Sequence, residues 1–315
     1  LMRKFVSSLL TVLLLNGTGV AWGVERNGFD LSDTLVPVAE IQGGGPAKDG
    51  IPALDHPSFI AADGADFLAP DDRVLGLARH GIAKAYPIAI LNWHEVVNDR
   101  FGNEPVVVTF CPLCGTGMAF LATVEGRALG FGVSGLLYNS DVLLYDRQTE
   151  SLWSQLMTTA ISGPLKGQRL TMAPVAHTTW ADWRERHPAT RVLSPDTGHR
   201  RDYGRDPYAG YVQSEQVMFP LRFENRRFHP KESVIGVELD GRFKAYPFAE
   251  LERTATPFTD RIGERGVRVE YDAAHRTGRV LDATGREIPS VIGFWFAWHA
   301  FHPETEVYTA PKPSR

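Results

Sequence analysis

The chain has 315 residues, of which 43% are hydrophobic and 22% are charged, and its formal net charge is -4. This composition is ordinary for a globular protein and supplies enough apolar residues for one large core or two smaller ones. Because no run of Lys and Arg stands out, the composition argues against a nucleic-acid-binding protein.

The N-terminal segment has the pattern of a secretory signal peptide. A positive pair precedes an apolar run over residues 5–15, and small residues then lead to Ala21-Trp22-Gly23. The run is too short to cross a bilayer as a helix, and the tripeptide fits a cleavage site. We therefore predict a signal peptide over residues 1–23 rather than a membrane anchor. The mature protein is expected to be exported, periplasmic or extracellular, without a transmembrane segment.

Three sequence blocks occur twice in the same order. They share VLGL or VIGV followed by KAYP, then a strand-like run ending in Thr-Gly, then Trp-x-x-Trp before His-Pro. The blocks cover residues 74–91, 106–117 and 180–192, and then 234–251, 267–278 and 295–307. Such self-similarity predicts an α+β, strand-dominated fold in which two diverged copies of one β-rich unit form a two-lobed globular protein.

The blocks also divide the mature chain. We expect an N-terminal extension, a first copy with an additional segment, a linker rich in Arg, Asp, Gly and Pro, and a degenerate second copy. These parts span residues 24–73, 74–194, 195–233 and 234–310.

The predicted elements of the first copy begin with a hairpin around Gly81. Pro87 suits the first turn of a helix that we expect to continue to about Asn98. The β-branched run 106–110 predicts a strand that is central in a sheet. Further strands are expected over 129–133 and 142–145, and a short helix capped by Thr178 or Thr179 over 179–187.

The chemistry is concentrated in Cys111-Pro112-Leu113-Cys114, which contains the only two cysteines of the chain. A disulfide across this spacing closes almost no loop, so it would stabilise the fold little. The second copy has Asp272 and His275 where the first has the cysteines, so the turn itself does not require thiols. The pair therefore indicates a functional site that binds a metal ion or undergoes redox chemistry.

Two further residues are potential ligands beside the cysteines. On the predicted helix, residues 90, 94 and 97 share a face, which directs His94 toward the strand that carries the cysteines. The alternative for His94 is a hydrogen-bonded core histidine. Met118 is a soft donor or a core side chain. We expect Glu95 at the surface, and Asp272 with His275 as either a remnant site or a solvated turn.

The residues around Phe110-Cys111-Pro112-Leu113-Cys114-Gly115 belong to a wider pattern. The chain closely resembles the DUF3179 family of exported bacterial and archaeal proteins in segments that extend over nearly the whole mature chain. These segments are residues 49–53, 91–95, 133–135, 137–140, 152–155, 207–211 and 294–298. The resemblance implies no reaction, because the function of that family is unknown.

The resemblance does place several residues in signature segments of the family. His94, Cys111 and Cys114 lie in such segments, and so do the Lys48-Asp49-Gly50 loop and Tyr138-Asn139-Ser140. We therefore include Lys48, Asp49, Tyr138, Asn139 and Ser140 as residues that could line a pocket at the cysteines.

Three functions remain open on the sequence. The first is a site for one copper or zinc ion formed by Cys111, Cys114, His94 and Met118. The soft donors in an exported protein favour copper, and the absence of a second Cys pair disfavours a closed structural zinc site. The second is thiol–disulfide exchange by Cys111 and Cys114, and the third is a non-enzymatic binding module. The partner would accordingly be a small molecule or a redox or metal-transfer protein.

Overall fold

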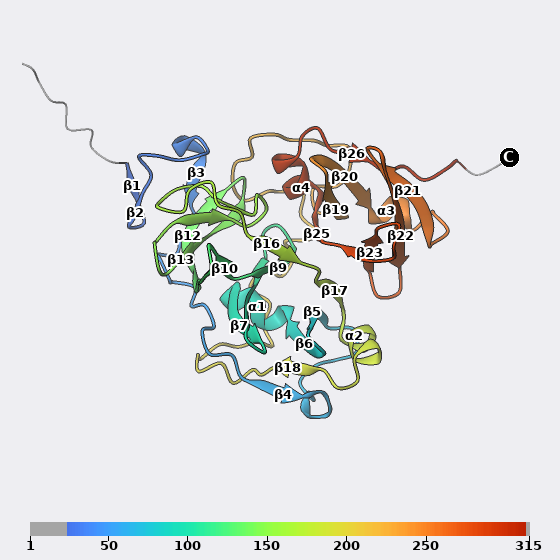
Figure 1. The fold of residues 1–315 in the computed structure, drawn as a ribbon, viewed down its shortest axis with the longest axis horizontal. Coiled ribbons are helices and arrows are strands. Elements are labelled where there is room, and N and C mark those ends of the chain that lie inside the picture. Colours follow the sequence, from blue (N-terminus) through green and yellow to red (C-terminus); the bar gives the residue numbers. More distant parts are fainter. Residues whose placement is uncertain (1–23, 313–315) are drawn as a thin grey trace, which may run out of the picture.

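The computed structural model describes residues 24–312, which are built mainly from strands with four short α-helices (Figure 1). This confirms the predicted α+β, strand-dominated class. The predicted signal peptide lies outside the described residues. Within residues 24–312, no helix has the length and apolar character needed to cross a membrane.

The predicted hairpin around Gly81 forms the centre of a five-stranded sheet. In spatial order this sheet consists of β17 (Ala176–Thr179), β5 (Arg73–Arg79), β6 (Ile82–Pro87), β18 (Arg191–Leu193) and β4 (Phe59–Ala61). Helix α2 (Trp180–Arg186) follows β17, and the Thr179 side chain accepts a hydrogen bond from the backbone N–H of Asp182, which confirms the predicted cap.

The helix after Pro87 is shorter than predicted. Helix α1 covers Ile88–His94 and ends at Glu95, which has a left-handed backbone with φ of 58°. Residues Val96–Phe101 then form strand β7. The prediction of a helix to Asn98, with Val97 on the same face as His94, is therefore wrong. The β-branched pair Val96-Val97 favours the strand, where it is fully buried.

An eight-stranded sheet joins the first part of the chain to the last (Figure 1). Along its main path the strands are β26 (Glu306–Val307), β20 (Arg242–Pro247), β19 (Ser233–Leu239), β25 (Ser290–Phe294), β9 (Thr116–Leu121), β8 (Glu104–Cys111) and β7, and β16 (Thr171–Ala173) pairs with β9. The predicted strand 106–110 lies inside β8, between β7 and β9, so its central position is confirmed. Within this sheet the two halves are joined where Ile292 of β25 pairs with Gly117 of β9. The backbone N–H of Phe294 also donates to the carbonyl of Cys114 at 2.8 Å.

Two other sheets complete the main architecture. The additional segment forms a five-stranded sheet of β15 (Thr159–Ala160), β14 (Leu152–Ser154), β13 (Asp141–Asp146), β12 (Phe131–Tyr138) and β3 (Ile41–Gly43). Near the C-terminus lies a four-stranded sheet of β21 (Phe258–Ile262), β22 (Arg265–Asp272), β23 (Thr277–Leu281) and β24 (Glu287–Ile288). Both strands predicted in the additional segment, 129–133 and 142–145, correspond to β12 and β13.

The remaining elements are short. They are β1 (Glu25–Arg26), β2 (Phe29–Asp30), β10 (Thr123–Val124), β11 (Arg127–Ala128), the 3-10 helices η1 (Val38–Glu40) and η2 (Ala62–Gly64), and the α-helices α3 (Phe248–Leu251) and α4 (Trp295–Phe301).

One arrangement of strand pairs occurs at both ends of the chain. Strand β6 pairs with β5 on one side and, in parallel, with β18 on the other, while β17 lies antiparallel to β5. Strand β20 has the same relationships to β19 and β26, with β25 antiparallel to β19. A Trp packs directly on a glycine in each set, Trp183 on Gly76 and Trp298 on Gly236.

Residues 195–232 contain no helix or strand. This segment nevertheless packs on the largest core cluster through Tyr208, Val217, Phe219, Leu221 and Phe228. That cluster includes Cys111 and Cys114, so the segment packs on the same core that contains both thiols.

Candidate functional site

The two cysteines lie in the tight turn that joins β8 to β9. Cys111 ends β8, and the backbone N–H of Cys114 donates to the carbonyl of Cys111 at 3.2 Å. Gly115 follows with φ of +62°, and a Cβ there would lie 2.8 Å from the Phe294 ring, so the turn requires glycine on both counts. Both thiols are free and buried.

A second tight turn brings a carboxyl group to the thiols. Strands β12 and β13 are joined by Asn139 and Ser140, whose φ values of 52° and 65° form a two-residue hairpin turn. Asp141 begins β13, and its carboxyl group lies beside the cysteines. The ligand atoms of Cys111, Cys114 and Asp141 are all within 4.8 Å of one another, and all three residues are buried.

The hydrogen bonds of this cluster leave several acceptor positions open. The Cys114 thiol donates to the Ser140 carbonyl, with 3.3 Å between sulfur and oxygen, and Cys111 Sγ lies 4.0 Å from the same oxygen. Asp141 Oδ2 accepts from the backbone N–H of Leu156 at 3.1 Å. Asp141 Oδ1 and Ser140 Oγ are buried without a hydrogen-bond partner among the described residues. Such orphaned atoms are uncommon in protein interiors and suggest a ligand.

Burial disfavours every negative charge in the cluster. It raises the pKa of Cys111 and lifts that of Cys114 well above its usual value. It raises the pKa of Asp141 to about 7 and that of Glu95 to about 8, and the charge of Asp141 adds to the shift of Glu95. Neither carboxyl group forms a salt bridge within residues 24–312. The site therefore contains acids whose ionised forms have no compensating cation.

Two tyrosines from the segment 195–232 lie close to these acids. Burial, followed by the charges of Glu95 and Cys111, raises the pKa of Tyr208. Burial and the charges of Cys114 and Cys111 likewise raise the pKa of Tyr211, whose hydroxyl is buried without a partner in the described chain. The Lys231 ammonium lies 4.3 Å from the centre of the Tyr211 ring and donates to the carbonyl of Ser214 at 2.8 Å.

A small network of buried polar side chains connects the strands on either side of the cysteine turn. The Thr116 hydroxyl donates to Gln155 Oε1 at 2.7 Å, and Gln155 Nε2 donates to the Thr109 hydroxyl at 2.8 Å. All three side chains are buried. The network connects β8 and β9 to the end of β14, so the additional sheet and the cysteine hairpin are held in register.

His94 is buried but is satisfied by other partners. Its Nδ1 lies 2.8 Å from the Pro52 carbonyl and its Nε2 lies 2.6 Å from the Tyr203 hydroxyl. Asp141, and not His94, completes the cluster with the two cysteines. The geometry thus matches the alternative of a hydrogen-bonded core histidine, and a role for His94 as a metal ligand is left as a prediction.

Met118 and Glu95 are both close to the site in the fold. Met118 is buried in the same core cluster as the cysteines, which accommodates either of its predicted roles. Glu95 is only 7% exposed, so the expectation of a surface position is wrong. The early end of α1 accounts for the difference, because Glu95 ends the helix and leads directly into the buried start of β7.

The predicted pocket residues fall into two groups. Tyr138, Asn139 and Ser140 form the turn before Asp141 and are buried, with Ser140 in contact with the thiols. Lys48 instead pairs with Glu150, and Asp49 accepts from the Tyr145 hydroxyl at 2.5 Å. Lys48 and Asp49 thus support the outer part of the additional sheet, and no contact joins them to the cysteines within residues 24–312.

Asp272 and His275 also belong to a compact group, together with Asp182, with ligand atoms within 4.8 Å of one another. These atoms already have partners. Asp182 forms a salt bridge with Arg186, Asp272 Oδ1 accepts from the backbone N–H of Ala274 at 2.9 Å, and His275 Nδ1 lies 2.7 Å from the Thr179 hydroxyl. We therefore assign no metal site there.

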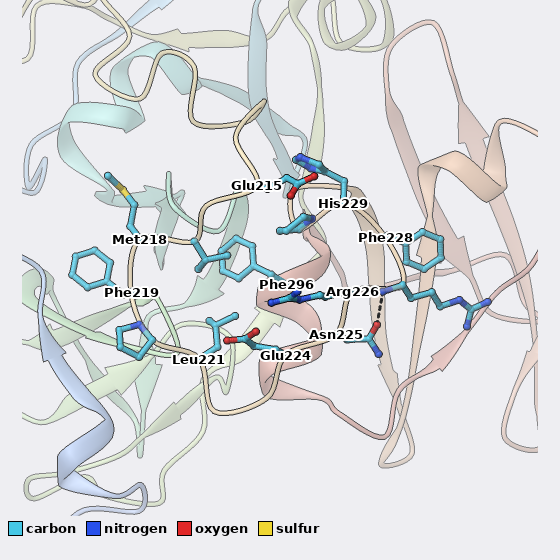
Figure 2. Close-up of a pocket in the computed structure, with 14 residues that line it drawn as sticks. Glu215, Met218, Phe219, Leu221, Glu224, Asn225, Arg226, Phe228, His229 and Phe296 are labelled. Carbon is cyan, nitrogen blue, oxygen red and sulfur yellow. Dashed lines mark hydrogen bonds between the residues drawn. The ribbon is translucent and has the colours of Figure 1, made fainter.

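A cavity of about 930 Å³ lies within the segment 195–232, beside the cysteine core. Figure 2 shows how residues 215–230 loop around it, with Phe296 of α4 near the centre. Its apolar lining residues Val217, Phe219, Leu221 and Phe228 pack on the cluster that includes the cysteines. The cysteines themselves do not line this cavity.

Sequence reasoning missed Asp141 as a member of the site. The carboxylate is far from the cysteines along the chain and approaches them only because the β12–β13 turn packs on the β8–β9 turn. The sequence contains one signal for it, because Asp141 directly follows Tyr138-Asn139-Ser140, which are predicted to line a pocket at the cysteines.

The chain matches the family described as "Protein of unknown function (DUF3179)" over residues 48–305. This match covers most of the chain, which therefore belongs to that family. No curated protein and no solved structure matches this chain.

Proposed function

We propose that this member of the DUF3179 family binds one metal ion of the zinc class through Cys111, Cys114 and Asp141. The observation that carries the proposal is the buried cluster of two thiols and one carboxyl group, with ligand atoms within 4.8 Å of one another. Two sulfurs and an oxygen at such separations match the donor types that hold zinc in proteins.

The charges of the site support a cation as the natural occupant. A buried thiolate or carboxylate is costly unless a positive charge compensates it. A bound dication would displace the protons of Cys111, Cys114 and Asp141 and provide that compensation. The unpartnered Asp141 Oδ1 adds support, because it is a buried acceptor without a donor among the described residues.

The donor set bears on which metal is bound. Thiolates accept both copper(I) and zinc, whereas a carboxylate is a harder ligand that suits zinc better than copper(I). Because Asp141, and not His94, lies with the two cysteines, we favour zinc over copper. Three protein ligands leave the fourth position of a tetrahedral site for water or a substrate, as in catalytic zinc sites.

Thiol–disulfide exchange fits the same residues less well. The attacking species in that chemistry is an accessible thiolate with a lowered pKa. Burial instead raises the pKa of Cys111 and Cys114, and the surrounding protein covers both residues. A partner protein would have to displace this cover before it reached either sulfur.

The metal content of the purified full-length protein tests the proposal. We expect about one zinc per chain by mass spectrometry, and loss of that zinc in Cys111→Ser, Cys114→Ser and Asp141→Asn. Asp272→Asn is the matched control and should retain the metal. A wild-type protein that takes up neither zinc nor copper, with both thiols free to titrate, would rule out the metal site.

We propose further that the chain is composed of two diverged copies of one unit, joined by the linker 195–233. The duplicated strand pairing and the two Gly–Trp contacts support this. So do two partly buried ion pairs at equivalent positions, Lys84 with Asp99 at 2.8 Å and Lys244 with Asp260 at 2.7 Å. In this view only the first copy, residues 74–194, carries the metal site.

We also propose that the protein is exported after cleavage near Gly23. The positive pair, the short apolar run and the small residues of segment 1–23 support this proposal. Fractionation of cells followed by N-terminal sequencing tests it. The expected product begins just after Gly23 and lies outside the cytoplasm, and an uncleaved cytoplasmic chain would contradict the proposal.

A further inference from the structure

Glu95 occupies a backbone position that is unfavourable for its residue type. It ends α1 with φ of 58° and ψ of -28°, in the left-handed region. Glycine is the usual residue at such a helix end, because an L-residue meets its own backbone there. A glutamate in this conformation costs conformational energy that the surrounding structure must offset. Other non-glycine residues of the chain share this backbone region, so the strain gains meaning only together with the surroundings of the side chain.

The environment of the Glu95 side chain adds a second cost. The residue is 7% exposed, and its carboxyl group has no hydrogen bond or salt bridge among the described residues. A largely buried carboxyl group without a protein donor loses part of its hydration when the chain folds, which is unfavourable. The strained backbone and the unpaired side chain occur at the same residue, which indicates a functional constraint.

The position of Glu95 relates it to the cysteine cluster. Its carbonyl accepts a hydrogen bond from the backbone N–H of Phe110 at 2.8 Å, one residue before Cys111. Its carboxyl group lies within electrostatic range of Asp141 and of Cys111. It is nevertheless not among the groups whose ligand atoms lie within 4.8 Å of one another. Glu95 is therefore beside the cluster and outside the direct ligand set.

We propose that Glu95 is a positioning residue of the metal site, whose carboxyl group hydrogen-bonds the water at the fourth coordination position. This inference rests on the proposed zinc site. A water bound to the metal reaches beyond the ligand atoms, so a carboxyl group just outside the ligand set is in the appropriate place to hold it. Groups that orient metal ligands in this way usually affect metal affinity by about 10- to 100-fold.

The test measures zinc affinity of the full-length protein by competition with a chromogenic chelator. We expect Glu95→Gln to retain one zinc per chain with an affinity about 10- to 100-fold weaker than wild type. We also expect the visible spectrum of the cobalt(II)-substituted protein to change, because the coordinated water is no longer held. Without metal, Glu95→Gln should unfold at the same temperature as wild type or higher, since a buried acid has been removed.

Glycine variants separate backbone strain from the role of the carboxyl group. Glu125 is exposed and also has a left-handed backbone, with φ of 50°, so it is a matched control. Both Glu95→Gly and Glu125→Gly should raise the unfolding temperature of the metal-free protein, and only Glu95→Gly should weaken zinc binding.

Two results would overturn the inference on Glu95 alone. One is a wild type that binds zinc while Glu95→Gln binds it equally well with an unchanged cobalt spectrum. The other is a large fall in the unfolding temperature of metal-free Glu95→Gln, which would make Glu95 a purely structural residue. If the wild type binds no zinc or cobalt at all, the proposed metal site itself fails, and the inference fails with it.

Discussion

The Asn139 side chain accepts a hydrogen bond from the backbone N–H of Arg222, with 2.8 Å between Oδ1 and nitrogen. Its amide nitrogen also donates to the carbonyl of Ala300 at 3.3 Å. The turn that presents Ser140 and Asp141 to the thiols is therefore attached both to the segment 195–232 and to helix α4. This single side chain links three regions that are distant in the sequence.

Replacement of Asn139 by Ala should destabilise the protein measurably. The change removes two hydrogen bonds, leaves the N–H of Arg222 without its acceptor and places Ala at a φ of 52°, which Asn tolerates better. We expect the free energy of unfolding to fall by about 2 kcal/mol in urea denaturation.

Ser140→Gly is the matched control for this variant, because Ser140 lies in the same turn with φ of 65° and its hydroxyl has no partner in the described chain. Glycine is favoured there, so stability should be unchanged or slightly higher. Equal losses in the two variants would show that the turn conformation, and not the Asn139 hydrogen bonds, determines stability.

Much of the local structure could be predicted from the sequence, because it depends on short-range patterns. The hairpin of β5 and β6 follows from two β-like runs around Gly81. The central position of β8 follows from its β-branched residues, and the start of α2 follows from the Thr179 cap. Each of these signals lies within a few residues of the element that it specifies.

The composition of the site depended on contacts between distant segments and could not be predicted in full. Asp141 reaches the thiols only through the packing of two hairpin turns. The burial of Glu95 follows from the position at which α1 ends. That position could not be predicted, because the apolar spacing of residues 88–97 fits a longer helix as well as a helix followed by a strand. Nothing in the sequence of residues 195–232 indicates that Tyr211 packs near the thiols.

Zinc should stabilise the folded protein if it binds at the proposed site. A ligand that binds only the native state at a free concentration 100 times its Kd raises the free energy of unfolding by about 2.7 kcal/mol. We expect an increase of this size in urea denaturation, reversed by a chelator. Asp141→Asn should lose most of the increase, whereas Asp272→Asn should retain it. Equal stabilisation of both variants would place the metal elsewhere.

His94 should make stability depend on pH below neutrality. Burial lowers the pKa of His94 from 6.5 to about 4. The hydrogen bond to Pro52 opposes this shift, and the charges of His199 and Arg201 add to it by smaller amounts. Between these values the unfolded chain takes up a proton that the folded chain does not. The contribution of His94 to stability should therefore fall as the pH decreases from about 6.5 to about 4, by up to about 3 kcal/mol. Asp141 and Glu95, whose pKa values are raised, contribute in the opposite direction, so the His94 effect is the difference between wild type and a His94 variant.

Urea denaturation at several pH values across this range measures the His94 effect. At neutral pH His94→Gln should be less stable than wild type, and this difference should shrink as the pH falls toward 4. If the difference between the variant and the wild type stays the same at every pH, His94 does not contribute to the pH dependence.

The two Gly–Trp contacts offer a test of the proposed duplication. A Cβ on Gly76 would lie 2.2 Å from the Trp183 ring, and a Cβ on Gly236 would lie 2.2 Å from the Trp298 ring. Both rings are buried, so neither can move away without disturbing the core. We expect Gly76→Ala and Gly236→Ala each to lower the free energy of unfolding by about 1 to 3 kcal/mol, as overpacking of a core does.

The control for this pair is Gly266→Ala, since Gly266 also lies in a strand but a Cβ there meets nothing within 4 Å. Its stability should stay close to that of wild type. Similar losses at Gly76 and Gly236 would support equivalent packing in two related units. A loss at only one of them would mean that the other Trp can be displaced, which would argue against a shared structural requirement.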